Sequence, residues 1–198
     1  MKNLDKSRIL SAIDRAGMPK VPLPKIPVFD PPASPLEQFE ASIASAKGNT
    51  IRCQIWEFPQ LVKDWIANSC SSGAFVLSGI DSLTGYADFK DLPETAQQLA
   101  HLDIAVLEGK FGVAENGAIW LPESVMGHRS VPFICQHLIL VIPTSTIAPN
   151  MHEAYKRISL KDCGYGVFIG GPSKTADIEQ SLVVGAHGPR SLTVFLLE

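Results

Sequence analysis

Small and polar residues are concentrated near the end of the chain, in GGPSKTADIEQSLVVGAHGPRSL, residues 170–192. Gly171 has no Cβ, so its backbone can approach a ligand closely or adopt a positive φ. Ser173 is the predicted N-cap of a helix, and the free N–H groups at a helix start attract carboxylate or phosphate. Lys174 and Thr175 would add a positive charge and a hydroxyl. The stretch is therefore a candidate site for a small anion.

Titratable side chains follow in the same stretch and could carry acid–base chemistry. Asp177 and Glu179 make the segment too acidic for a simple anion cradle, but Asp177 could orient Lys174 or transfer a proton. His187 lies beside a predicted Gly-Pro turn. The competing interpretation is a helix cap followed by two glycine turns, with no ligand, and the residue types alone leave both open.

A second candidate is the single carboxylate of Glu115 in GVAENGA, residues 112–118. Its neighbours Asn116 and Gly117 are small or polar, so a substrate could approach the carboxylate, which could act as a nucleophile or a general base. Asn116 and Gly117 would then border the ligand. The competing interpretation is a hairpin turn, because Asn-Gly is a strong type I′ turn pair.

Thr144 follows the apolar segment FICQHLILVIP, residues 133–143, and is a candidate ligand contact at the end of a predicted strand. Asn150 is the predicted N-cap of the next helix. His137 lies inside the apolar segment and is predicted to be a satisfied core histidine. The dinucleotide, P-loop and serine-hydrolase motifs are absent from the sequence, so those activities lose their usual support.

The composition is that of a globular protein and excludes several classes. The 198-residue chain has a net charge of −3 and no basic run, which argues against nucleic-acid binding. No apolar run is long enough to span a membrane and the N-terminus lacks the apolar region of a signal peptide, so a cytoplasmic location is expected. The four cysteines are widely separated, which gives no argument for a metal or cluster in this chain.

The elements that must position these residues alternate between helices and strands. Apolar periodicity and capping residues predict helices at 4–16, 34–48, 58–69, 92–102 and 150–160. Apolar runs predict strands at 73–80, 133–143, 164–171 and 191–198, with two short strands or a hairpin within 103–123. This interleaving predicts an α/β domain with a mostly parallel sheet and helices on both faces.

The N-terminal region is predicted to be organised separately. Residues 19–35 are rich in proline, which excludes a regular helix or a central strand. We expect an extended arm that crosses the surface or reaches a neighbouring subunit, with a flexible linker as the alternative. The predicted division is therefore residues 1–33, an N-terminal helix and Pro-rich arm, and residues 34–198, the α/β domain.

Two segments resemble a known family. Residues 171–198, GPSKTADIEQSLVVGAHGPRSLTVFLLE, resemble the C-terminal signature of the LUD-domain family, in particular its lactate utilization protein C (LutC/YkgG-like) group. Residues 111–121, FGVAENGAIWL, resemble the family's middle motif, which usually reads closer to AETGT; Asn116 and Ala118 replace its two threonines. The resemblance covers residues 73–198.

The resemblance implies a fold like that of the NagB/RpiA/CoA-transferase group. It also implies a subunit of an L-lactate oxidation system that acts beside iron–sulfur partner proteins and carries no cofactor of its own. Glu115, the Ser173 turn and His187 are then expected to converge on one small carboxylate or phosphate ligand. Two alternatives stay open: an acyl-transfer enzyme of CoA-transferase type with Glu115 as nucleophile, and a non-catalytic assembly subunit. A homodimer is also left open.

Overall fold

The computed structural model describes residues 2–17, 21–22, 24–70, 72–89, 92, 95–159, 164–176, 182–184 and 188–198. The chain divides by its internal contacts into two units, Met1–Asp30 and Pro31–Glu198. In the first unit, helix α1 (Lys2–Arg15) occupies the predicted position and exposes Ile9, Leu10 and Ile13. Its described residues after Gly17 form neither helix nor strand.

The second unit is built on a five-stranded sheet in the order β1-β10-β6-β3-β2, and every neighbouring pair is parallel. Its strands are β1 (Asn49–Cys53), β2 (Val76–Ser78), β3 (Ile104–Glu108), β6 (His137–Pro143) and β10 (Ser191–Leu197). Strand β10 lies between β1 and β6, and its full length pairs with β6 from Ser191↔His137 to Leu197↔Pro143. The last strand in the chain is therefore internal to the sheet.

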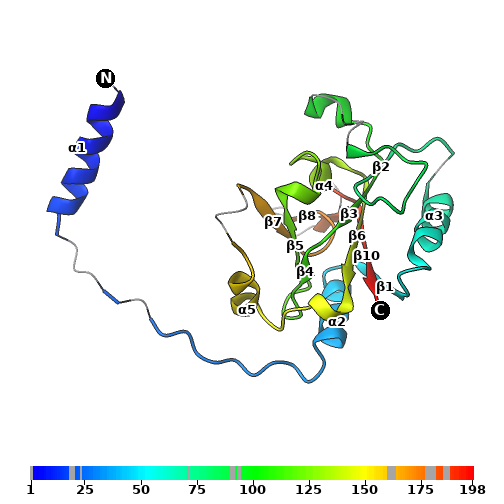
Figure 1. Ribbon diagram of the computed structural model, residues 1–198, viewed down its shortest axis with the longest axis horizontal. Helices are drawn as coiled ribbons and strands as arrows, with labels where there is room; N and C mark the ends of the chain where they lie inside the picture. The colour runs from blue at the N-terminus through cyan, green and yellow to red at the C-terminus, as the bar shows by residue number, and fades with distance from the viewer. Residues whose placement is uncertain are drawn as a thin grey trace. The chain divides into compact units, whose positions relative to one another are not determined.

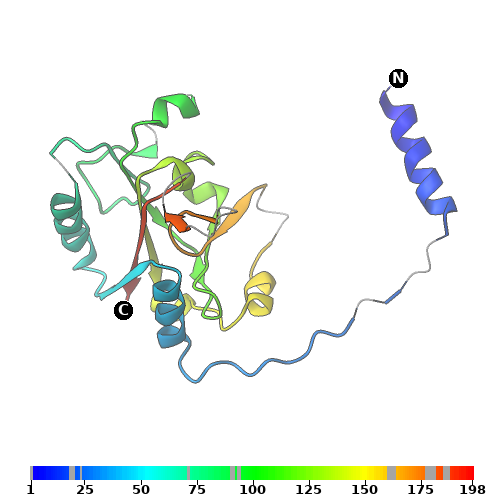
Figure 2. The same cartoon turned by 180° about the vertical axis from the view of Figure 1, so that it is seen from behind.

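Two helices cover the two faces of this sheet, because the strands are apolar on both sides. Helix α3 (Phe58–Ser69) buries Phe58, Val62 and Ile66 in a cluster with alternate strand residues such as Ile139. Helix α2 (Pro35–Ser45) buries its own apolar side chains in the cluster that contains the other strand positions. Figure 2 shows the two helices on opposite sides of β10. The predicted α/β architecture is confirmed.

Helix α2 begins where its sequence signature predicts. The Ser34 hydroxyl accepts a hydrogen bond from the Glu37 N–H at 3.4 Å, and Pro35 fills the first helical position, where no N–H donor is required. Phe39 and Ile43 lie one turn apart and are fully buried, so they fix α2 on the sheet.

A smaller antiparallel sheet lies on the α2 side, as Figure 1 shows to the left of the main sheet. Its strands are β4 (Phe111–Gly112), β5 (Ile119–Pro122) and β7 (Gly166–Ile169), in the order β4-β5-β7. Ile119 and Leu121 of β5 enter the same apolar cluster as α2. The other helical elements that the structure describes in full are η2 (Ala96–Leu99), η3 (Glu123–Val125), α4 (Val131–Ile134), η4 (Thr144–Thr146) and α5 (Met151–Lys156).

The predicted helix start at Ser173 is wrong. The chain there forms β8 (Lys174–Ala176), which pairs antiparallel with β9 (Leu182–Val184). Thr175 pairs with Val183, and such β-branched residues suit a strand more than a helix start. Ser173 instead donates its backbone N–H to the carbonyl of Pro189 at 2.9 Å, so it anchors a ribbon and caps no helix.

Two further elements differ from the prediction. Strand β1 was not predicted, and it extends the sheet at its β10 edge. The predicted helix at 92–102 is a 3-10 turn, η2, closed by a capping box between Thr95 and Gln98. Among the helices that the structure describes, none has the length and apolar character needed to cross a membrane.

Candidate functional site

A cavity of about 500 Å³ lies along the outer side of α2, and we call it the α2 cavity. Residues from three separate parts of the sequence line it: Gln38, Ala41, Ser42, Ser45, Ala46, Glu115, Asn116 and Lys174. Its size falls in the range of small-molecule sites. Three of the candidate residues from the two motifs, Glu115, Asn116 and Lys174, therefore border one space.

The turn between β4 and β5 carries Glu115 and Asn116. The Val113 N–H donates to the Ala118 carbonyl at 2.8 Å, and the Gly117 N–H donates back to the Val113 carbonyl at 2.9 Å. The Asn116 side-chain oxygen accepts from the Ala118 N–H at 3.0 Å, which leaves its NH₂ group to serve a ligand. Gly117 has φ +70°, as a tight turn of this kind requires. A hairpin is thus present, but its turn is not the predicted type I′, because Gly117 has a positive φ and Asn116 does not. Glu115 occupies the exposed tip.

The Glu115 carboxylate is held in place from a third segment. Its Oε2 accepts a hydrogen bond from the Met151 N–H at 2.9 Å, at the first residue of α5. The same helix is capped by Asn150, whose Oδ1 accepts from the Glu153 N–H at 3.0 Å, as predicted. The bond to Met151 uses one carboxylate oxygen, and the side chain remains exposed.

Helix α2 lines the same cavity and is joined directly to the turn. The Ser42 hydroxyl donates to the Ala114 carbonyl at 2.7 Å, and Gln38 Nε2 donates to Ser42 Oγ at 3.4 Å. Contact is so close at Gly117 that a Cβ there would lie 2.8 Å from the Ile43 nitrogen. The turn and the helix therefore form one rigid wall.

A glycine bend after β7 brings Lys174 to this wall. Gly171 has φ +117°, and a Cβ at this position would lie 2.9 Å from the Ala46 carbonyl oxygen at the end of α2. Its neighbour Gly170 lies against the turn, with Asn116 O 3.6 Å from an added Cβ. Lys174 then opens β8, is exposed and lines the cavity.

The other predicted residues are distributed differently. Thr144 donates its hydroxyl to the Leu197 carbonyl at 3.1 Å and is not among the cavity's lining residues. Ser173 is half-buried beside Gly188, where an added Cβ would lie 3.0 Å from Ser173 Cβ. Asp177 and His187 lie outside the described residues, and of Thr175 only the strand position is described.

Residues of α2 complete the cavity and were not predicted to take part in a site. Gln38, Ser42 and Ser45 recur at helical spacing on the face that flanks the buried side chains Phe39 and Ile43. A stripe of polar side chains beside a buried one was the signal in the sequence. Such a stripe is equally typical of an ordinary solvent-exposed helix face. Only its proximity to the Glu115 turn identifies it as part of a cavity.

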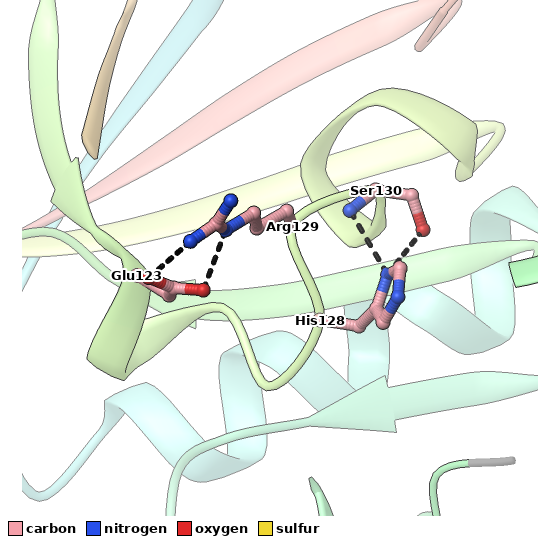
Figure 3. A network of polar contacts seen from close by, with 4 residues as sticks. All are labelled: Glu123, His128, Arg129 and Ser130. Atoms are coloured by element: carbon pink, nitrogen blue, oxygen red, sulfur yellow. Dashed lines mark hydrogen bonds and ion pairs between the residues drawn. The ribbon is translucent and has the colours of Figure 1, made fainter. Parts of the chain in front are cut away.

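A separate polar network fixes the segment between β5 and α4, as Figure 3 shows. Arg129 binds both carboxylate oxygens of Glu123, at 2.5 and 3.0 Å, and its guanidinium lies 5.0 Å above the Tyr165 ring. The hydrogen bond from Arg129 lowers the pKa of Glu123. His128 Nδ1 accepts from the Ser130 N–H at 3.2 Å and lies 2.8 Å from its hydroxyl. These contacts organise a loop and contribute no residue to the α2 cavity.

The loop after β2 forms a smaller pocket, of about 250 Å³, beyond the carboxyl end of that strand. Asp81, Thr84 and Tyr86 are among its lining residues. Within the described part of the chain, no three His, Cys, Asp or Glu side chains are grouped as a metal site would require.

Fold and site together define an α/β protein whose cavity lies between a covering helix and a hairpin tip beside the sheet. Residues 88–197 match the model of the LUD domain family. The match covers more than half of the chain and includes both the Glu115 turn and the C-terminal ribbon. The chain belongs to the LUD domain family. Helix α2 lies outside the matched residues.

Several curated relatives carry the name lactate utilization protein C. A lactate utilization protein C from Shouchella clausii is 36% identical over 109 residues, which cover 52% of this chain and 47% of the relative. One from Halalkalibacterium halodurans is 38% identical, covering 50% and 44%. The uncharacterized protein YkgG of Escherichia coli is 28% identical, covering 53% and 48%. The chain spans about half the length of the curated relatives it matches.

A solved structure has the same fold. It is the crystal structure of a DUF162 family protein from Deinococcus radiodurans, with a TM-score of 0.65 over 84% of this chain and 98% of that chain. The two sequences are 19% identical, so this likeness concerns the fold alone.

Proposed function

We propose that this chain acts in lactate utilization, as a subunit that binds a small carboxylate in the α2 cavity. One observation carries the proposal. The two segments that resemble lactate utilization protein C, residues 111–121 and 171–198, both line this cavity, through Glu115 and Lys174, although they are far apart in sequence. The two electrons removed from lactate would pass to iron–sulfur clusters on partner subunits, the hydroxyl proton to Glu115 and the Cα proton to solvent.

The lining of the cavity suits a small hydroxy acid. Lys174 would pair with the carboxylate, and the NH₂ group of Asn116 would donate a further hydrogen bond. Glu115 would repel the carboxylate end, so it favours an orientation with the hydroxyl beside its own oxygen. There it could accept the hydroxyl proton as lactate is oxidised to pyruvate.

The test is growth on lactate of a strain that depends on this chain. Lys174→Gln removes the charge with little change in volume, and we expect at least about a tenfold loss of lactate-dependent growth rate or of reconstituted lactate oxidation, because a charge-assisted hydrogen bond is lost. Lys110→Gln is the matched control, since Lys110 is also exposed but pairs with Glu108 away from the cavity. Growth of the Lys174→Gln strain at the wild-type rate would contradict the proposal.

A second candidate is acyl transfer of the CoA-transferase type. The observation in its favour is the exposed Glu115 carboxylate, fixed at one oxygen by the Met151 N–H at the cavity wall. The free oxygen would attack an acyl-CoA thioester, form a mixed anhydride and release the CoA thiolate. Incubation with acyl-CoA followed by hydroxylamine should then convert Glu115 to a hydroxamate. An unmodified Glu115 peptide in the mass spectrum counts against this candidate.

A third candidate is an assembly role without catalysis, which rests on the exposed apolar side chains Val21, Ile26 and Val28 of the Pro-rich segment. Deletion of residues 18–33 should then abolish co-purification with an iron–sulfur partner while leaving the fold of the second unit intact. Undiminished co-purification would remove the arm from this role.

A further inference from the structure

Another cavity, of about 350 Å³, opens at the amino ends of the central strands, and we call it the amino-edge pocket. It shares no lining residue with the α2 cavity. Its lining is Ser69, Cys70, Ser72, Gly73, Ala74, Asp103, Gln136, His137 and Arg190. None of these residues has a part in the proposed function.

The sheet itself brings the polar residues of this pocket into a row. His137 is the first residue of β6 and pairs with Ile104 of β3 on one side and with Ser191 of β10 on the other. Backbone bonds extend the order beyond the strands, because the His137 N–H donates to the Asp103 carbonyl at 2.8 Å. The Arg190 N–H likewise donates to the Gln136 carbonyl at 2.7 Å. The positions of Asp103, His137 and Arg190 are therefore fixed by the pairing of three parallel strands.

The imidazole of His137 is fixed on two sides. Its Nδ1 lies 2.8 Å from the Ser191 hydroxyl, and its ring stands edge-on to Trp65 of α3 with centroids 5.9 Å apart. His137 is half-buried and lines the pocket. Since Nδ1 is engaged by Ser191, Nε2 is the ring nitrogen left to serve a ligand.

The charged groups that act on His137 at this pocket are one arginine and one aspartate. Arg190 is exposed at the pocket rim. The carboxylate of Asp103 is already used in part, because its Oδ2 accepts the Phe75 N–H at 2.8 Å. Burial lowers the pKa of His137, Arg190 lowers it further, and Asp103 acts in the opposite direction. The remaining titratable group of the lining is the Cys70 thiol, whose pKa burial and Asp103 raise, so it stays neutral near pH 7.

We propose that the amino-edge pocket binds a small oxyanion, a carboxylate or a phosphate, between the Arg190 guanidinium and Nε2 of His137. The Arg190 fork matches the two oxygens of either group. Gln136 and the hydroxyls of Ser69 and Ser72 supply further donors at the same wall. The pocket volume of about 350 Å³ lies at the lower end of the range of small-molecule sites, so an acetate or phosphate ion fits within it.

Binding at this position must be linked to protonation of His137. An anion beside Nε2 favours the imidazolium and raises the pKa that burial and Arg190 hold down. By linkage, the affinity for the anion then increases as the pH falls from 8 to 6. A site formed by lysine or arginine alone would bind a carboxylate equally at both values.

The experiment is a ¹H NMR titration of the full chain with sodium acetate and, separately, with inorganic phosphate at constant ionic strength set by chloride. We expect a saturable shift of the His137 Hε1 signal, identified by its absence from the His137→Gln spectrum. For acetate, whose own charge does not change over this range, we expect tighter binding at pH 6 than at pH 8. Saturation by acetate alone identifies a carboxylate site, by phosphate alone a phosphate site, and by both a general oxyanion site.

Variants separate this pocket from the α2 cavity. Arg190→Gln should weaken binding by about tenfold or more, and Arg190→Lys, which keeps the charge but loses the fork, should weaken it less. Lys174→Gln should leave the His137 shift unchanged, so failure here and failure of the proposed function are distinguishable. A His137 signal that neither salt moves beyond the chloride control, or equal affinity of the Arg190→Gln protein, would overturn the proposal.

Discussion

The close contact between the Glu115 turn and α2 can be tested at Gly117. The substitution Gly117→Ala adds one methyl group at a residue with φ +70°. The new Cβ would lie 2.8 Å from Ile43 N, 3.1 Å from Ser42 C and 3.2 Å from Ile43 Cα. All three atoms belong to the backbone of α2, so no side chain can rotate away to make room. The helix or the turn must move.

Two terms set the expected loss of stability. A non-glycine residue in the left-handed region costs about 1–2 kcal/mol. An extra methyl group forced into a packed contact costs about 1–3 kcal/mol more. The combined loss of about 2–5 kcal/mol is a large part of the free energy of unfolding of a typical domain. Because Gln38, Ser42 and Ser45 lie on the displaced helix, the α2 cavity should change as well.

The matched control is Gly85→Ala. Gly85 has φ +96°, and a Cβ there would meet nothing within 4 Å, so this variant carries only the conformational cost of about 1–2 kcal/mol. Urea unfolding followed by circular dichroism gives the free energy of unfolding of both variants. Equal losses for the two variants would refute the inference that α2 and the turn are in tight backbone contact.

Three other outcomes follow from single side chains. Ser42→Ala should lower the free energy of unfolding by about 1–2 kcal/mol, because the Ala114 carbonyl loses its donor, and denaturant unfolding checks this; no loss would mean that water replaces the hydroxyl. Since the pKa of His137 is lowered in the folded state, the unfolded state binds more protons, and stability should fall as the pH drops below about 6.5; thermal melts of His137→Gln should show a smaller fall. Burial raises the pKa of the Cys135 thiol to about 12, so Cys135 should resist a thiol reagent at pH 8 until the protein unfolds, and prompt labelling of native Cys135 would contradict its burial.

The framework of the fold could be read from the sequence because its signals are local. Ser34 and Pro35 mark the start of α2, and the apolar run from Leu138 to Ile142 marks a strand buried on both faces. Strand β1 was missed because NTIRC is short and mixed, with its first residue exposed. Only its pairing with β10, from a segment more than 140 positions away, makes it a strand.

The site could be predicted only in part, since its walls come from distant segments. Glu115 and Asn116 line the cavity and could be proposed from the sequence, because an isolated carboxylate in a glycine turn is a local pattern. The prediction of a helix cap at Ser173 is wrong, because a serine followed by a lysine is also compatible with a helix start. The pairing of Thr175 with Val183, which makes this segment a strand, is not visible in the local sequence. The contribution of α2 depends on the close approach of Gly117 and Gly171 to its backbone, which only the packed structure reveals.

Glu115 makes a structural hydrogen bond in addition to its proposed role as a proton acceptor or nucleophile. Both roles must be considered when a Glu115 variant is interpreted. Its Oε2 caps the first N–H of α5 at Met151, so Glu115→Ala would remove an acceptor from a helix start as well as the carboxylate from the cavity. Glu115→Gln keeps an oxygen acceptor for Met151 but can neither accept a proton nor act as a nucleophile. A role in chemistry therefore requires Glu115→Gln to lose activity with its melting temperature unchanged. If only Glu115→Ala loses activity, and in proportion to its stability, the carboxylate serves to join the turn to α5, and binding at the cavity depends on Lys174.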